Sequence, residues 1–127
     1  MSYTKVIYGI FAFFGKNKEF TTERVCIHNA FYILAKKEEY KDLLSDITFS
    51  ASEEYHKSLE IDQCIDNLIQ SRLITAKNPD LIKYQITPGL FNYYKDNEKD
   101  FFSNNIDIIK KLSQNLYSMV RNRNVMS

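Results

Sequence analysis

The sequence predicts an α+β domain dominated by helices, and three observations support this fold class. The 127 residues include only 3 glycines and 2 prolines, the residue types that disfavour a helix interior most strongly. Over most of the chain, apolar residues recur at spacings of three and four, the period of an amphipathic helix. The stretch from Ile74 to Ile86 instead alternates apolar and polar residues around a turn, which is typical of a β-hairpin.

The composition limits the class of protein. A hydrophobic fraction of 44% and a charged fraction of 26% are ordinary for a globular domain and exclude a disordered chain. The longest apolar run, Val6 to Phe14, is far shorter than the roughly 20 residues that span a bilayer. Cys26 and Cys64 belong to no CxxC or His-containing cluster, so we expect buried free thiols. These features predict a cytoplasmic protein without a membrane or metal partner.

The first half of the chain reads as helices. Residues 3–14 are apolar on nearly every side, which predicts a buried helix ending at Gly15. Thr21 or Thr22 should cap a second, strongly apolar helix that runs to Ala35. A short amphipathic helix should follow, with Tyr40, Leu43, Leu44 and Ile47 as its apolar residues.

Residues 48–57 show no period and predict a loop. The next helix has the clearest stripe, formed by Ile61, Cys64, Ile65, Leu68 and Ile69. The hairpin follows, with its turn at Asn78, Pro79 and Asp80. Thr87 should then cap a helix with Pro88 at its first position, and Ser103 or Asn104 should start the last helix.

The stretch from Ile65 to Thr87 carries a resemblance to a known superfamily. "IDNLIQSRLI", a polar turn and then "YQITPGL" resemble the recognition helix, wing and return strand of winged helix-turn-helix proteins of the MarR-like and PadR-like families. The matching positions are Leu68, Leu73, Ile74, Tyr84, Ile86, Thr87 and Gly89. The resemblance implies a winged-helix-like domain with a small antiparallel β-hairpin wing and a C-terminal helix. It also implies a DNA-binding transcriptional regulator without enzymatic activity.

On that pattern we expect a single domain over residues 1–127. Its parts would be an N-terminal helix (1–20), a helical core with the wing (21–87), C-terminal helices (88–122) and a tail (123–127). The composition, rich in Lys, Asn and Ile, hints at a bacterial or phage source.

Two features favour a protein partner instead of DNA. The connection from Ile47 to Ser58 runs to about ten residues, whereas a DNA-binding helix-turn-helix uses a turn of roughly three or four. In this layout the chain is similar to the Panacea-type domains associated with phages, and that resemblance implies an antitoxin-like or defence-associated module that docks on proteins. The second feature is the excess of acidic residues between Glu38 and Asp66, including Asp62 and Asp66 on the presumed recognition helix. We expect these carboxylates to repel DNA phosphates.

The candidate contacts to DNA or to a protein partner lie on that helix and on the hairpin: Lys57, Gln63, Asn67, Gln70, Lys77, Asn78 and Lys83. The last helix carries a second apolar stripe, which predicts a homodimer interface: Ile106, Ile109, Leu112, Leu116, Met119 and Val120. The alternative is that this stripe packs on the first helix of the same chain. His28 and His56 are the two histidines, and neither has neighbours that form a metal or catalytic set. We therefore expect no catalytic residue, no cofactor and no metal.

Overall fold

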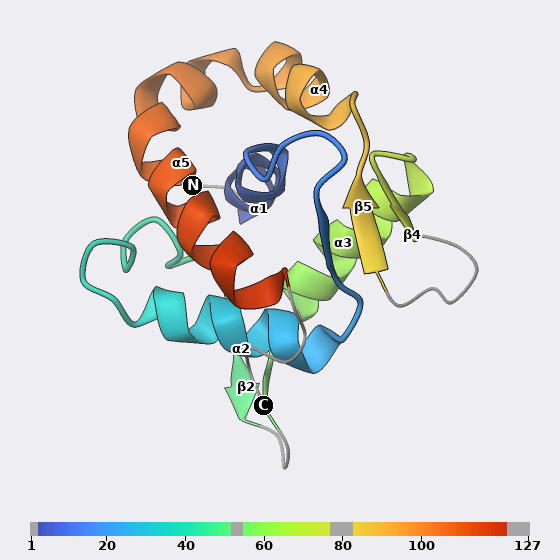
Figure 1. Ribbon diagram of the computed structural model, residues 1–127. Helices are drawn as coiled ribbons and strands as arrows, with labels where there is room; N and C mark the ends of the chain where they lie inside the picture. Colours follow the sequence, from blue (N-terminus) through green and yellow to red (C-terminus); the bar gives the residue numbers. More distant parts are fainter. Residues whose placement is uncertain (1–2, 52–54, 77–82, 122–127) are drawn as a thin grey trace.

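The structure is a computed structural model that describes residues 3–51, 55–76 and 83–121. The helices are α1 (Tyr3–Ala12), α2 (Arg24–Ala35), α3 (Leu59–Gln70), α4 (Leu90–Asn97) and α5 (Lys99–Val120). The strands are β1 (Glu19–Thr21), β2 (Ser50–Ala51), β3 (His56–Lys57), β4 (Ile74–Ala76) and β5 (Lys83–Ile86). Helices dominate and the sheets are small and antiparallel, which confirms the predicted α+β class (Figure 1).

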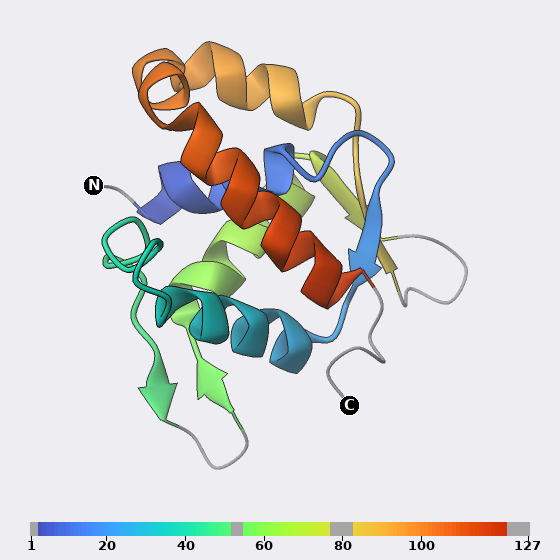
Figure 2. The same ribbon diagram turned by 60° about the vertical axis from the view of Figure 1, so that its left-hand side comes forward.

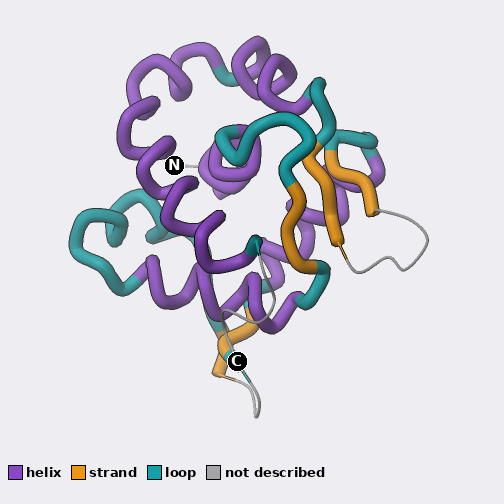
Figure 3. The backbone as a smooth tube through the Cα atoms, viewed as in Figure 1, coloured by secondary structure: helices purple, strands orange, loops and turns teal. Residues whose placement is uncertain are grey.

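Two small sheets lie at different places on the helical body (Figure 3). The larger has the order β1-β5-β4, with Ile74 opposite Ile86 and Phe20 opposite Tyr84. The β4–β5 pair confirms the predicted hairpin, although the predicted turn at Asn78, Pro79 and Asp80 lies outside the described residues. Strand β1 was not predicted. The β2–β3 pair projects from the body below α2, within the stretch predicted as a loop (Figure 2).

Helix α1 lies at the centre of the molecule, in contact with α3, α4 and α5 (Figures 1 and 2). Its Val6, Ile7, Ile10 and Phe11 are at most 1% exposed, as the apolar pattern predicted. Gly9 allows α4 to approach closely, because a Cβ at this position would lie only 2.6 Å from the hydroxyl oxygen of Tyr94. The core is therefore built around the first helix of the chain.

The segment between Ala35 and Ser50 differs from the prediction. Residues 37–46 form a succession of turns and not a short helix, with hydrogen bonds such as Ile47 N–H to the Leu44 carbonyl. Tyr40 and Leu44 are nevertheless buried, so the predicted apolar contacts form without the predicted helix. Several polar residues in this stretch have low helix propensity, and tertiary packing decides its conformation.

Helix α3 follows the predicted stripe, with Ile61, Cys64, Ile65 and Leu68 buried and Ile69 at the edge. Its first turn is capped by Ser58, whose hydroxyl accepts a hydrogen bond from the Ile61 N–H at 3.3 Å. The cysteines also agree with the prediction of buried free thiols. Cys26 and Cys64 are both free and buried, against α5 and α1 respectively.

The other differences from the prediction concern the residues at which α2, α4 and α5 begin. Helix α2 begins at Arg24 with Glu23 as its N-cap, while Thr21 lies in β1 and its hydroxyl accepts the Glu23 N–H. Thr87 does not cap α4, because its hydroxyl donates to the Leu73 carbonyl, and α4 starts only at Leu90. Helix α5 starts at Lys99, one turn before the predicted start, and is 22 residues long.

Candidate functional site: the exposed face of α3

The exposed face of α3 carries most of the predicted contacts that the structure describes. Gln63, Asn67 and Gln70 are exposed along this helix, and Lys57 is exposed just before it on β3. Lys83 lies half-buried on β5, where its Nζ donates a hydrogen bond to the Arg121 carbonyl at 3.1 Å. Lys77 and Asn78 fall outside the described residues. Three polar side chains and one lysine thus share one region, while Lys83 is partly engaged elsewhere.

Two of these side chains contact α1. The Tyr3 hydroxyl donates to Gln63 Oε1 at 3.3 Å. Tyr8 is hydrogen-bonded to Asn67, although burial outweighs that bond and raises the pKa of the tyrosine. These contacts hold Gln63 and Asn67 in place on the outer face of α3. Held side chains lose less conformational freedom on binding a ligand.

Arg24 occupies the flank of this face between α2, α3 and β5. Its guanidinium lies 2.8 Å from Asp62 Oδ1 and 2.9 Å from Asp66 Oδ1. It also donates two hydrogen bonds to the Tyr84 hydroxyl, at 3.0 and 3.3 Å. Burial acts to lower the pKa of Arg24, but the bonds to Tyr84, Asp66 and Asp62 outweigh burial and raise it. Arg24 therefore stays charged and neutralises part of the α3 carboxylate charge.

His28 extends this set of polar contacts into the core. Its side chain is fully buried, and its Nε2 lies 2.8 Å from Asp62 Oδ1. Its Nδ1 accepts the Ser58 N–H at 2.9 Å, which assigns the ring proton to Nε2. Burial lowers the pKa of His28 against the opposing effect of Asp62, which favours the neutral form of the ring. Both ring nitrogens are engaged within the protein, which explains the histidine as a structural residue at the start of α3.

Within the described residues, four carboxylates of the acidic segment from Glu38 to Asp66 have partners in the fold. Asp62 and Asp66 face Arg24, and Glu39 forms an ion pair with Lys111 of α5 at 2.8 Å. Glu60 accepts hydrogen bonds from the main chain and hydroxyl of Thr48. Arg24 and Lys111 come from outside the segment, so the charges along the sequence alone overstate the local excess of negative charge. Asp66 remains 61% exposed, so the correction to the predicted repulsion is partial.

The stripe predicted to form a dimer interface is mostly covered within the chain. Ile109, Leu112, Leu116 and Val120 are at most 1% exposed, because α5 packs across α1 and α2. The interpretation of these four residues as an intermolecular surface is therefore corrected in favour of the intramolecular alternative. Ile106 is 36% exposed and Met119 is half-buried. Homodimerisation itself stays a prediction.

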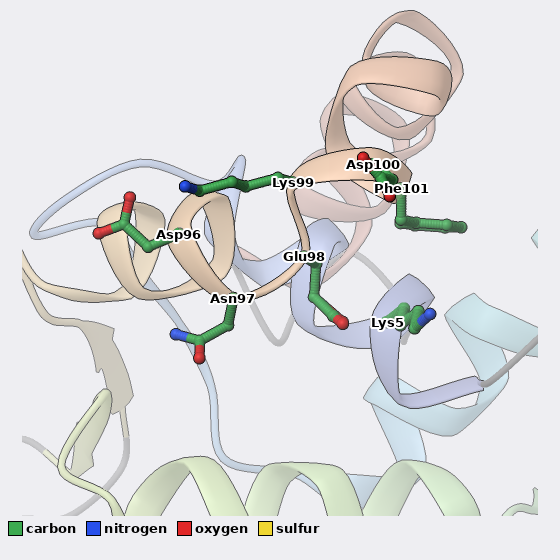
Figure 4. Close-up of a pocket in the computed structure, with 7 residues that line it drawn as sticks. All are labelled: Lys5, Asp96, Asn97, Glu98, Lys99, Asp100 and Phe101. Atoms are coloured by element: carbon green, nitrogen blue, oxygen red, sulfur yellow. The ribbon is translucent and has the colours of Figure 1, made fainter.

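A pocket of about 360 Å³ lies at the junction of α4 and α5 (Figure 4). Figure 4 shows that this junction supplies all of the lining residues except one from α1: Asp96, Asn97, Glu98, Lys99, Asp100 and Phe101, with Lys5. The pocket is open and carries charges of both signs. None of the predicted contact residues lines it, so it does not extend the α3 face.

Within the described residues, no group of three His, Cys, Asp or Glu side chains could hold a metal ion. Among the same residues, no helix is both long and apolar enough to cross a membrane. Comparisons with protein-family models, curated proteins and solved structures found no match to this chain.

Proposed function

We propose that this chain is a non-enzymatic winged-helix binding module whose ligand is duplex DNA. The observation that carries the proposal is the passage from α3 to the β4–β5 hairpin, in which a helix with an exposed polar face leads through one turn into a small antiparallel sheet. A helix followed directly by such a hairpin is one part of the winged helix-turn-helix arrangement. In helix-turn-helix proteins the recognition helix lies in the major groove.

The chemistry of the α3 face supports DNA as the ligand. Asn and Gln side chains can form paired hydrogen bonds with the major-groove edge of adenine, and Gln63, Asn67 and Gln70 follow one another at helical spacing. The ion pairs of Arg24 with Asp62 and Asp66 reduce the charge that would oppose the phosphates. This neutralisation favours DNA more than the sequence alone does.

One observation favours a protein partner as the second candidate. Leu59, at the first position of α3, is 70% exposed next to the β2–β3 pair. An exposed leucine at this place would add to the apolar centre of a protein interface, whereas it adds little to binding a polyanion. The β2–β3 pair also lies beside the start of α3, where a helix that enters a groove needs space (Figure 2).

The test is the binding of fluorescently labelled duplexes at low salt, followed by anisotropy. The variant Asn67→Ala/Gln70→Ala should lose discrimination between duplexes of different sequence, by roughly 1–3 kcal/mol for each base contact removed. The matched control is Asn104→Ala/Gln114→Ala, which removes the same side-chain types from exposed positions of α5. This control should bind like the parent protein.

Thermal melting followed by circular dichroism must show that both double variants remain folded, because Asn67 is hydrogen-bonded to Tyr8. If the parent protein does not bind duplexes at concentrations of tens of micromolar, the DNA proposal is wrong and protein docking replaces it. In that case Leu59→Ser is the variant to test against a candidate partner protein.

A further inference from the structure

Helix α3 ends in a backbone motif that usually requires glycine. The Leu73 N–H donates to the Leu68 carbonyl at 2.9 Å, and the Arg72 N–H donates to the Ile69 carbonyl at 3.0 Å. This pair of bonds is the Schellman motif, with Ser71 as the C-cap and the next residue in the left-handed conformation. That residue is Arg72, with a φ of 61°. A side chain at this position is strained, and glycine is not.

The interaction with the helix dipole does not explain an arginine at this position. A cation near the C-terminus of a helix is stabilised by the last carbonyl groups. The exposed positions of Gln70 and Ser71 would provide the same stabilisation with an ordinary helical backbone. Arg72 is exposed, and within the described residues its guanidinium has no ion pair or hydrogen bond. The fold therefore uses the backbone of Arg72 and leaves its charge unused.

The second non-glycine residue with a positive φ provides a comparison. Asn17 has a φ of 65°, and asparagine tolerates this conformation better than most residues. Its N–H donates to the Ile86 carbonyl at 2.8 Å, and its own carbonyl accepts a bond from Gln85 Nε2 at 3.3 Å. The identity and contacts of Asn17 thus fit the fold, whereas no contact among the described residues explains the identity of Arg72.

The described side chains around Arg72 place no charge that would oppose an anion bound to its guanidinium. In the sequence from residue 67 to residue 76, Arg72 is the single charged residue. The exposed neighbours in this stretch are uncharged: Asn67, Gln70, Ser71, Thr75 and Ala76. The carboxylates of α3 lie in its earlier turns, at Glu60, Asp62 and Asp66. Among the described residues, the C-terminal end of α3 is therefore the part of this helix where a cation without a partner and hydrogen-bonding side chains occur together.

We propose that Arg72 is a phosphate contact, with its guanidinium bound to the DNA backbone at the corner between α3 and β4. This inference rests on the proposed function and adds the residue that anchors the helix end. Backbone strain at a non-glycine position is retained where the side chain has a role outside the fold. Arginine suits phosphate because its planar group donates two parallel hydrogen bonds.

The experiment compares Arg72→Gly, Arg72→Lys and the control Asn17→Gly in thermal melts and in DNA titrations at several salt concentrations. Arg72→Gly should melt about 2–5 °C higher, because the left-handed strain is relieved. The same variant should bind duplexes roughly three- to tenfold more weakly at low salt, whatever their sequence. The dependence of log K on log salt should become less steep by roughly one.

Arg72→Lys should keep the salt dependence of the parent protein, because it keeps the charge. Asn17→Gly should bind DNA as the parent protein does. If the parent protein binds DNA and Arg72→Gly binds equally well with the same salt dependence, the phosphate contact is wrong while the proposed function stands. A loss confined to one DNA sequence would overturn the phosphate contact in favour of a base contact. If the parent protein does not bind DNA at all, both proposals are wrong.

Discussion

Two joints hold helices of this protein in place by different means. The polar joint connects α2, α3 and β5 through Arg24, His28, Ser58, Asp62, Asp66 and Tyr84. The apolar joint connects α1, α4 and α5 through Gly9, Phe13, Phe91, Tyr94 and Phe102. In the polar joint each group is bonded to a group from another element. In the apolar joint the rings pack at centroid distances of 5.5 to 5.9 Å, and the buried Tyr94 hydroxyl has no hydrogen-bond partner among the described residues.

The difference shows which joint depends on single residues. Removal of one member of a hydrogen-bonded set leaves its partners buried and unsatisfied, and the cost includes their desolvation. Removal of one atom from an apolar cluster costs the transfer free energy of that atom and a term for the small cavity left behind, and removal of an unpaired hydroxyl costs less still. The polar joint should therefore be sensitive to conservative changes that the apolar joint tolerates.

The largest effect is expected at Asp62, which accepts from both Arg24 and His28. Asp62→Ala should lower the free energy of unfolding by about 2–4 kcal/mol, since it leaves a cation and a buried imidazole without their acceptor. Asp66→Ala is the matched control and should cost less than about 1 kcal/mol, because the Asp66 side chain is largely exposed. Urea denaturation measures both values. If both variants lose the same free energy of unfolding, the polar joint does not depend on Asp62 as the acceptor shared by Arg24 and His28.

A smaller effect is expected from pH. Because burial lowers the pKa of His28, the folded chain takes up this proton at a lower pH than the unfolded chain. The unfolded state therefore binds more protons below the ordinary histidine pKa, and stability falls as the pH falls. The melting temperature should decrease between about pH 7 and about pH 5. His28→Gln should melt lower at neutral pH and lose most of this dependence. If His28→Gln keeps the full pH dependence of the melting temperature, other titratable groups cause it.

The smallest effect is expected at Tyr94 in the apolar joint. Tyr94→Phe should leave stability unchanged or raise it by up to about 1 kcal/mol, because it removes a buried hydroxyl without a partner. Gly9→Ala should be destabilising, since the added Cβ would lie 2.6 Å from this hydroxyl oxygen and 2.8 Å from the ring carbon that bears it. Calorimetry measures both variants. A clear loss of stability in Tyr94→Phe would indicate a partner that the described residues do not provide.

The sequence predicted the parts of the fold that depend on local periodicity. The α3 stripe and the β4–β5 pair are visible from spacing alone, because burial on one face imposes a period on the residues. Strand β1 was missed because its 3 residues are too short to show a period, and its pairing with β5 joins Glu19 to Gln85 across the chain. The turns at 37–46 were missed because their apolar spacing is also that of a helix.

The position of the candidate site on α3 could be predicted from the sequence, but the cation that pairs with its carboxylates could not. Gln63, Asn67 and Gln70 could be assigned to an exposed face from helical spacing. The role of Arg24 could not, since many cations of the chain could have paired with Asp62 and Asp66. The one-turn spacing of the two aspartates is compatible with a shared cation, but only the tertiary fold, which brings Arg24 of α2 beside both of them, selects Arg24. Long-range electrostatics is decided by tertiary contacts that local spacing does not contain.

The two buried cysteines can report local opening of the fold through their reaction with thiol reagents. Cys26 lies between α2 and α5, with its Sγ 3.8 Å from the Met119 carbonyl, and Cys64 lies between α3 and α1 next to Thr4. Burial raises the pKa of both thiols, that of Cys64 to about 11. A thiol reagent can therefore modify either residue only when the surrounding helices separate. Labelling rates under native conditions report the opening of each helix pair separately, and no cysteine has to be introduced.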